Sequence, residues 1–341
     1  MARTVKRPSR ASVQPGPDFI CIGAQKAGTQ WLYDQVQHHA DFWMPPIKEF
    51  HYFDRRSARG ERAERLWRKA QADLEATNRE RAAHSDREMG ARDVAFLEAY
   101  VRLTKGHRAG LFSRVAMAGS TVATRILPGY ADIHRRRVWP ALQAGRRKDF
   151  RRYSELFARK GISLSGDVTP GYSILGAPTV RAITQAFPDL KIVLLVRDPV
   201  ERFWSAVAMH VRNRRGLWPE TRQDLERLLG RPDYFNRSYQ TQIVARWQPS
   251  VPKENFGVFL FDDLLADAAG FRRRVLAFLG GDPDKPSGSL PPGFNRKERG
   301  LKRPLPPEFR RILGQLFAEE LLASARVFGG AATEWPVKYG L

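Results

Sequence analysis

The sequence is poor in cysteine, has no long apolar run, and carries far fewer acidic than basic residues. Its single cysteine, Cys21, excludes an internal disulfide and any metal site built from several cysteines. No stretch approaches the roughly 18 consecutive apolar residues of a membrane-spanning helix. The basic segment Met1–Gly16 has no apolar core, so we expect a disordered tail there and no secretory signal. We therefore expect a cytoplasmic protein with a tail at 1–16 and a single domain at 17–341.

The shortage of acids leaves a net charge of +22, from 58 Lys and Arg against 36 Asp and Glu. Half of this excess lies between Lys105 and Lys160, a stretch with 14 basic and three acidic residues. It belongs to a basic segment at about 56–160, which we interpret as a helical insertion that is either a lid or ligand-binding element, or scaffold alone. Such a field attracts nucleic acid, membrane surfaces and phosphorylated or sulfated ligands, but it is also typical of a solvated face.

Short apolar runs alternate with helical patterns along the chain. Asp18–Ala24 and Leu190–Val196 are the strongest strand candidates, and each passes directly into a helix; Ile162–Asp167 and Asn255–Phe261 are weaker ones. Helical patterns cover about 31–39, 61–80, 90–104, 177–187, 199–213, 219–230, 235–247, 268–280 and 306–327. The alternation predicts an α/β fold, P-loop-like and three-layered, with a central, mainly parallel sheet flanked by helices. Ligands in such folds bind beyond the carboxyl ends of the strands.

The segment Gly23–Trp31 (GAQKAGTQW) joins the first strand to a helix. Backbone N–H groups at a helix N-terminus have no partner in the helix and bind phosphate oxygens. Gly28 allows close backbone approach, Thr29 caps the helix or donates to an oxygen, and Lys26 adds a positive charge. The lysine precedes the glycine, so this is not the nucleotide triphosphatase motif G-x-x-x-x-G-K-[ST]. The alternative is an ordinary turn with a solvated lysine.

A second pattern, Arg197–Ser205 (RDPVERFWS), follows the strongest strand. Asp198 is predicted to be the N-cap, followed by a proline at the first helical position, and Glu201 completes a capping box. Arg197 and Ser205 have no such structural explanation. About two helical turns, or ~10 Å, separate the cap from the serine. An arginine lying along the helix could therefore share one phosphate group with that hydroxyl.

Both patterns resemble signatures of the sulfotransferase family. Lys26–Trp31 is similar to its 5′-phosphosulfate loop, K-[SAT]-G-T-[TS]-W, and Arg197–Ser205 to its 3′-phosphate motif, R-[ND]-P-[VIL]-x-R-[AF]-x-S. Phe294–Arg299 is similar to the family's late basic loop, although such loops are also often simply solvated. The resemblance implies that the donor 3′-phosphoadenosine 5′-phosphosulfate is bound by Lys26, Ala27, Gly28, Thr29, Gln30, Trp31, Arg197, Ser205, Asn295, Arg296 and Lys297.

Two of these positions, Gln30 and Trp31, differ from the family pattern or allow a structural alternative. Gln30 replaces the usual Thr or Ser of the family loop, and its amide can still donate to a phosphate oxygen. Trp31 occupies the position at which the family's ring stacks on adenine; the alternative is a core aromatic at the start of the helix.

The segment Lys48–Asp54 (KEFHYFD) holds the catalytic candidates. If it is extended, Glu49, His51 and Phe53 share one face, so that a carboxylate and an imidazole converge. The segment resembles K-E-x-[HQ]-[FY]-F of heparan-sulfate sulfotransferases and their bacterial relatives. The resemblance implies that Glu49 is the general base, that His51 orients the acceptor or supplements the charge, and that Lys26 stabilises the leaving group. It implies no metal ion. Without the resemblance, the alternative is that Glu49 and His51 form an exposed polar pair.

The segment Gly166–Ser173 (GDVTPGYS) is similar to the family's E-K-[ST]-P-x-Y, which lines the acceptor side. Asp167 and Tyr172 are therefore candidate acceptor-binding residues, with a structural turn as the alternative. Val168 stands where some members have a catalytic lysine, so we expect Lys26 to act without that partner. The segment Ser238–Trp247 also resembles a family helix, with its role open. The resemblance spans about 18–55 and 160–300.

We therefore predict a sulfotransferase that acts on a hydroxyl or amine of a carbohydrate or small molecule. The basic insertion favours an anionic acceptor such as a saccharide, a lipid or a metabolite. A P-loop-type kinase is one alternative, but the position of the lysine disfavours it. A non-enzymatic protein that binds anions or nucleic acid is another; only the net charge favours it, and no nucleic-acid-binding module is recognisable.

Overall fold

The computed structural model describes residues 16–45, 48–54, 150–158, 160–213, 216–229, 235–285, 290–293 and 303–341. The tail expected at 1–16 lies outside these ranges except for Gly16. Most of the insertion expected at about 56–160 also lies outside them, including the helical patterns at 61–80 and 90–104. Both therefore stay predictions.

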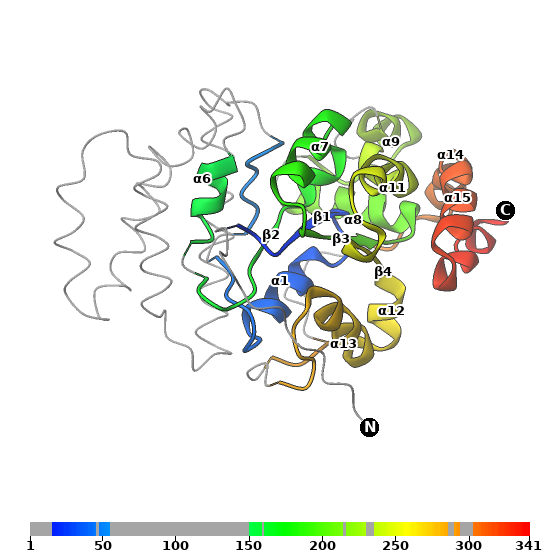
Figure 1. Cartoon of the computed structure of the whole chain (residues 1–341). Helices are drawn as coiled ribbons and strands as arrows, with labels where there is room; N and C mark the ends of the chain where they lie inside the picture. Colours follow the sequence, from blue (N-terminus) through cyan, green and yellow to red (C-terminus); the bar gives the residue numbers. More distant parts are fainter. Residues whose placement is uncertain are drawn as a thin grey trace, which may run out of the picture.

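The centre of the fold is a sheet of four parallel strands in the order β2-β1-β3-β4. The strands are β1 (Phe19–Gly23), β2 (Gly166–Val168), β3 (Lys191–Val196) and β4 (Phe256–Leu260). Together with the flanking helices, this confirms the predicted α/β fold with a parallel central sheet (Figure 1).

Strand β2 begins later than the predicted segment Ile162–Asp167. The chain turns before it, because the Ser163 amide donates to the Lys160 carbonyl at 3.1 Å. Ile162 is 86% exposed. Leu164 forms an isolated bridge with Phe42 and so pairs outside the four named strands. The pairing of β2 with β1 therefore begins only at Gly166.

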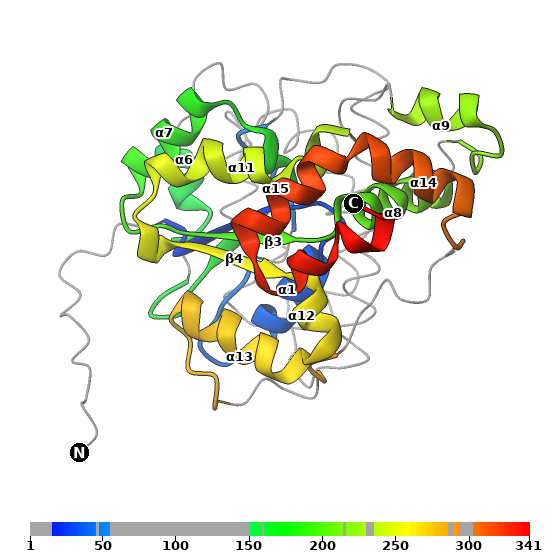
Figure 2. The same ribbon diagram turned by 90° about the vertical axis from the view of Figure 1, so that its right-hand side faces the viewer.

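Helices cover both faces of the sheet (Figure 2). One face carries α7 (Ala177–Ala186), α8 (Pro199–Arg212), α11 (Gln240–Trp247), α14 (Pro307–Leu316) and α15 (Ala318–Phe328); the other carries α1 (Thr29–Gln37), α12 (Phe261–Ala266) and α13 (Ala268–Leu279). Side chains alternate along a strand, so Ile20 and Ile22 enter the first core while Phe19 and Cys21 enter the second. The described residues therefore form three layers.

The remaining described elements are two further helices and a set of 3₁₀ turns. They are the helices α6 (Phe150–Glu155) and α9 (Arg222–Leu229) and the 3₁₀ turns η2 (Pro170–Ile174), η3 (Asn236–Ser238), η4 (Gln248–Ser250), η5 (Lys253–Asn255), η6 (Gly330–Glu334) and η7 (Val337–Tyr339). Within the ranges that the structure describes, no helix has the length and apolarity needed to cross a membrane.

Two predicted helices are interrupted. The pattern at 306–327 forms α14 and α15, which meet at Phe317. The ring of Phe317 is fully buried against Phe203, so tertiary packing ends one helix and starts the next at this residue. The pattern at 235–247 begins as η3 and becomes α11 only after Tyr239, whose backbone leaves the helical region at φ −82° and ψ 73°.

Candidate active site

The turn after β1 carries the predicted anion loop. Gly28 is the N-cap of α1 and has a left-handed backbone, with φ 97°. The left-handed backbone favours glycine, and a Cβ at this position would also pack tightly on the ring of Phe261, at 3.2 Å. Thr29 is the first residue of the helix, so the cap is Gly28 and not Thr29. The N–H groups of the first helical turn thus end at this loop, where an anion can accept from them.

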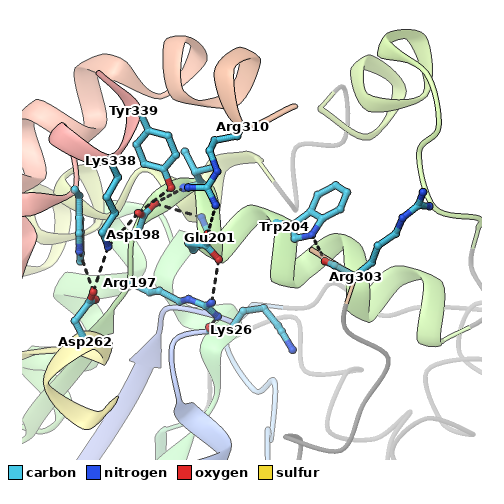
Figure 3. Close-up of polar contacts among 12 residues, drawn as sticks. Lys26, Arg197, Asp198, Glu201, Trp204, Asp262, Arg303, Arg310, Lys338 and Tyr339 are labelled. Atoms are coloured by element: carbon cyan, nitrogen blue, oxygen red, sulfur yellow. Dashed lines mark hydrogen bonds and ion pairs between the residues drawn. The ribbon is translucent and has the colours of Figure 1, made fainter. Parts of the chain in front are cut away.

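Arg197 joins the turns that follow three neighbouring strands. Its guanidinium donates to the Lys26 carbonyl at 3.2 Å and lies 4.9 Å from the ring centre of Phe261, just after β4 (Figure 3). Its backbone N–H donates to the Gln240 side chain at 2.8 Å, and the Gln240 amide donates back to the Arg197 carbonyl. Burial lowers the pKa of Arg197. The loop of β1 and the motif of β3 therefore lie side by side.

The N-terminus of α8 is capped as predicted by Asp198. Its carboxylate accepts from the amides of Val200 at 2.9 Å and Glu201 at 3.3 Å, and its other oxygen accepts from the Tyr339 hydroxyl at 2.9 Å (Figure 3). The Glu201 carboxylate lies 3.5 Å from the guanidinium of Arg197. The first turn of α8 thus also binds Arg197, the arginine that precedes the helix.

Two further arginines lie behind the anion loop, and the sequence analysis did not identify them as site residues. Arg202 is fully buried; it donates to the Ser238 hydroxyl at 2.8 Å and to the Gln25 carbonyl at 3.5 Å. Burial, with smaller effects from Arg237 and Arg197, lowers the pKa of Arg202 to about 9. Arg237 donates to the Gln25 side chain at 2.8 Å, and its Nε is buried with no hydrogen-bond partner. An anion in the loop would offset this positive charge, so the residues present fit a phosphorylated ligand.

The Lys48–Asp54 segment is not extended, so the shared face that an extended segment would give is not formed. Glu49 and His51 both have left-handed backbones, with φ 65° and 54°. Phe50 and Phe53 therefore enter the same core cluster and do not take opposite faces. The structure nevertheless brings the carboxylate and the imidazole together, with Glu49 Oε2 at 3.3 Å from His51 Nε2.

Asp54 completes this cluster, and the sequence analysis gave it no role. Its Oδ2 lies 2.8 Å from His51 Nδ1, on the opposite side of the ring from Glu49. Lys48 Nζ donates to the second oxygen of the Glu49 carboxylate, Oε1, at 2.7 Å. Asp54 is three residues after His51, a spacing that a turn can bring into contact. Glu49 retains 24% side-chain exposure, so a ligand can reach it.

The segment after β2 connects this cluster to the anion loop. A Cβ on Gly23 would lie 3.3 Å from the Pro170 carbonyl, and a Cβ on Gly171 would collide with the carboxylate of Asp54 and approach His51 Nδ1 at 3.2 Å. The loop after β1, the turn after β2 and the Lys48–Asp54 segment are therefore in direct contact.

The two predicted acceptor-binding residues are buried. Asp167 is 2% exposed and Tyr172 is fully buried. The Asp167 carboxylate accepts from Thr169 at 2.6 Å and from Tyr153 at 2.9 Å. Burial raises the pKa of Asp167 to about 6. The Tyr172 hydroxyl accepts from the Tyr52 backbone amide at 2.9 Å. These side chains lie beneath the segment that carries Glu49.

The residues at the start of α1 are also packed. Trp31 is 3% exposed, lies edge-on to Phe271 at 5.1 Å, and donates to the Pro292 carbonyl at 2.6 Å. The ring thus has the contacts of a core aromatic, the second of the two interpretations given above. The amide of Gln30 donates to Asp34 at 3.0 Å. Ser205 lies on α8 and is half-buried.

The late loop residues Asn295, Arg296 and Lys297 lie outside the described ranges, but the chain on both sides of them is held. Before the loop, Trp31 on α1 binds Pro292. After it, the indole of Trp204 on α8 donates to the Arg303 carbonyl at 2.7 Å (Figure 3). The two ends of the loop are thus fixed to the two helices that follow the anion-binding motifs.

Comparison with known proteins places this arrangement in a family. Residues 17–284 match the profile of the Sulfotransferase family. The chain therefore belongs to the sulfotransferase family and is a sulfotransferase. This confirms the predicted activity over the kinase and the non-enzymatic alternatives.

The chain is also similar to solved structures, and the first of these agrees with the fold. A sulfotransferase from Alicyclobacillus acidocaldarius has a TM-score of 0.53 at 19% identity, with 94% of this chain and 98% of that one covered. The sulfotransferase domain of the curacin biosynthetic pathway has a TM-score of 0.44 at 16% identity, covering 89% and 98%. That of the Synechococcus PCC 7002 olefin synthase has 0.42 at 12%, covering 97% and 96%. No curated protein matches by sequence.

Proposed function

We propose that this sulfotransferase moves the sulfuryl group of 3′-phosphoadenosine 5′-phosphosulfate to a hydroxyl or amine of a carbohydrate or small-molecule acceptor, without a metal ion. The contact between Arg197 and the Lys26 carbonyl is the main support. It joins the two anion-binding motifs at one edge of the sheet, where one ligand with two anionic ends can meet both.

The donor-binding residues divide into two groups. The N–H groups at the start of α1 and Lys26 hold the 5′-phosphosulfate, together with Ala27, Gly28, Thr29 and Gln30. Arg197 and Ser205 hold the 3′-phosphate with Asn295, Arg296 and Lys297, while Trp31 is packed as a core aromatic and supports the start of α1. When bound, the donor supplies an activated sulfuryl group and leaves as adenosine 3′,5′-bisphosphate.

The protein's own residues then move one proton and stabilise one charge. Glu49 takes the proton from the acceptor hydroxyl as the acceptor oxygen bonds to sulfur. His51, 3.3 Å from Glu49 and held at its other nitrogen by Asp54, orients the acceptor. Lys26 and the loop amides stabilise the negative charge that grows on the departing bridging oxygen, as preorganised donors do in phosphoryl transfer. The loop is partly buried, and burial strengthens such charge interactions.

The acceptor is proposed to be anionic, on the basis of the charge of segment 105–160. A saccharide, a lipid or a metabolite would each satisfy this charge. Incubating the protein with radiolabelled donor and each acceptor class would identify it by the product that carries label.

The donor itself is tested by calorimetry with adenosine 3′,5′-bisphosphate. We expect binding that is the same with Mg²⁺ or with a chelator, and that ATP does not displace. A requirement for Mg²⁺, or a preference for ATP, would contradict the proposed donor. Absence of binding by either nucleotide would contradict it as well.

A further inference from the structure

The segment that carries the proposed general base has a backbone conformation that is unfavourable without support from other parts of the fold. Glu49 and His51 are both in the left-handed region, which side chains with a Cβ rarely adopt. Such residues keep this conformation only where surrounding contacts impose it. The Lys48–Asp54 segment therefore depends on a partner elsewhere in the fold to keep Glu49 beside His51.

The partner is a chain of hydrogen bonds that begins at the end of β2. The Tyr52 amide, between the two residues His51 and Phe53, donates to the Tyr172 hydroxyl at 2.9 Å. The Asp167 carboxylate lies close to the Tyr172 hydroxyl and interacts with it electrostatically. Asp167 also accepts from Tyr153 at 2.9 Å. All three of the side chains in this chain are buried, so water does not compete for these bonds.

The direction of these bonds follows from the chemistry of Asp167. An ionised carboxylate only accepts, so a hydroxyl that faces it turns its single proton toward it. Because the only proton of the Tyr172 hydroxyl points to Asp167, its oxygen can only accept a hydrogen bond from the Tyr52 amide. The carboxylate thereby selects the one hydroxyl orientation in which Tyr172 accepts from the segment. An amide in place of the carboxylate would present a donor as well and would remove this selection.

We propose that Asp167 is a positioning residue for the general base: through the hydroxyl of Tyr172 it fixes the backbone of Lys48–Asp54 and so keeps the Glu49 carboxylate on His51. This role differs from the acceptor contact predicted from the sequence. It rests on the proposed function in one respect, the assignment of Glu49 as the base.

The test compares Tyr172→Phe and Asp167→Asn with the wild type, all saturated with adenosine 3′,5′-bisphosphate. Hydrogen exchange at the peptide containing Tyr52 is expected to become about tenfold faster in both variants, because an amide hydrogen bond is lost. Exchange in the β1 and β3 peptides stays as in the wild type. Asp284→Asn, which changes an exposed carboxylate in the same way, serves as the control and leaves exchange unchanged.

A second measurement, NMR of the His51 ring, reports on the pairing of Glu49 with His51. The ring lies 3.3 Å from Glu49 and 2.8 Å from Asp54, with Lys48 on the far side of Glu49. Loss of the Glu49 contact changes the surroundings of the ring and therefore the chemical shifts of its protons. Tyr172→Phe changes no charge and does not alter His51 itself, so shifted His51 ring resonances would show that the segment has moved.

The rate of donor hydrolysis, with water as the acceptor, separates failure of this proposal from failure of the proposed function. We expect Tyr172→Phe and Asp167→Asn to slow the release of labelled sulfate while the bisphosphate dissociation constant is unchanged. If both variants retain wild-type exchange, His51 ring resonances and hydrolysis while Glu49→Gln is impaired, Asp167 has no positioning role. If Glu49→Gln itself hydrolyses the donor normally, the proposed base is wrong.

Discussion

The guanidinium of Arg197 donates a hydrogen bond to the carbonyl of Lys26 at 3.2 Å, although the two residues are 171 positions apart in the sequence. Each residue belongs to a motif that follows a strand, β3 for the arginine and β1 for the lysine, and the two strands are neighbours in the sheet. Parallel pairing places both turns at the same edge, which is why two distant signatures can form one ligand site.

The first prediction concerns this arginine. Arg197→Ala should weaken the binding of adenosine 3′,5′-bisphosphate by about tenfold or more, because it removes a charge-assisted contact to a phosphate group. Arg197→Lys should fall between the wild type and the alanine variant, since a lysine keeps the charge but loses the planar fork. Calorimetric titration measures both.

Arg222→Ala is the matched control, because the Arg222 side chain is 70% exposed on α9. Its dissociation constant should equal that of the wild type. An unchanged affinity in Arg197→Ala would remove Arg197 from the donor site.

The second prediction concerns Glu49. Glu49→Gln should lower turnover by about 10² to 10⁴, the range typical of a lost general base, while bisphosphate affinity is retained. The affinity survives because the predicted donor-binding positions do not include this carboxylate. Glu226→Gln, on an exposed ion pair with Arg222, should leave turnover unaffected. Full activity in Glu49→Gln would show that another group accepts the proton.

The central strand β3 and the cap of α8 could be predicted from the sequence because local chemistry decides them. The apolar run at Leu190–Val196 needs burial on both faces, and this alone indicates a central strand. Asp198 followed by Pro199 indicates a helix N-terminus whatever the rest of the chain does. The same local information predicted that the anion loop and the arginine motif each follow a strand.

Other features of the site depend on contacts between distant segments and could not be read from the sequence. The left-handed backbone of Glu49 and His51 has no local signal, and an alternating pattern suggested an extended segment instead. Arg237 meets Gln25 across 212 positions, so nothing near either residue indicates the pairing. The burial of Trp31 is decided by Phe271 and Pro292, which belong to other parts of the chain.

The third prediction is a pH dependence of stability that arises from Asp167. Burial raises its pKa from 3.8 to about 6 in the folded protein. Between these values the folded state binds more protons than the unfolded state, so the free energy of unfolding decreases as pH rises through this window. The stabilisation from the protonated form is complete below pH ~4 and lost above pH ~6, a change of about 3 kcal/mol.

Asp167→Asn removes the titration and should flatten this part of the profile. Urea unfolding of both proteins between pH 4 and 7, about the window given by these pKa values, measures the difference in slope. Other buried acids, such as Asp198 and Glu320, titrate equally in both proteins, so their contributions cancel when the two pH profiles are compared. Parallel profiles would mean that the folded-state pKa of Asp167 is not raised.

The last prediction concerns the space between the turn after β2 and the base cluster. A Cβ on Gly171 would collide with the Asp54 carboxylate, and His51 Nδ1 would lie 3.2 Å away. Gly171→Ala should therefore displace Asp54 from His51 and slow sulfuryl transfer by about tenfold or more, in keeping with the cost of a misplaced catalytic group. Bisphosphate affinity should be retained, because Arg197 and the α1 N-terminus are not touched.

Gly176→Ala is the control for this change. Its Cβ would meet no atom closer than 3.8 Å, and its backbone lies in the extended region at φ −70° and ψ 150°, which alanine adopts freely. The two variants therefore carry the same chemical change, one against the His51–Asp54 pair and one in open space. Equal turnover in both would show that the close approach of Gly171 to Asp54 has no part in catalysis, whereas a loss confined to Gly171→Ala would tie the rate to the position of His51.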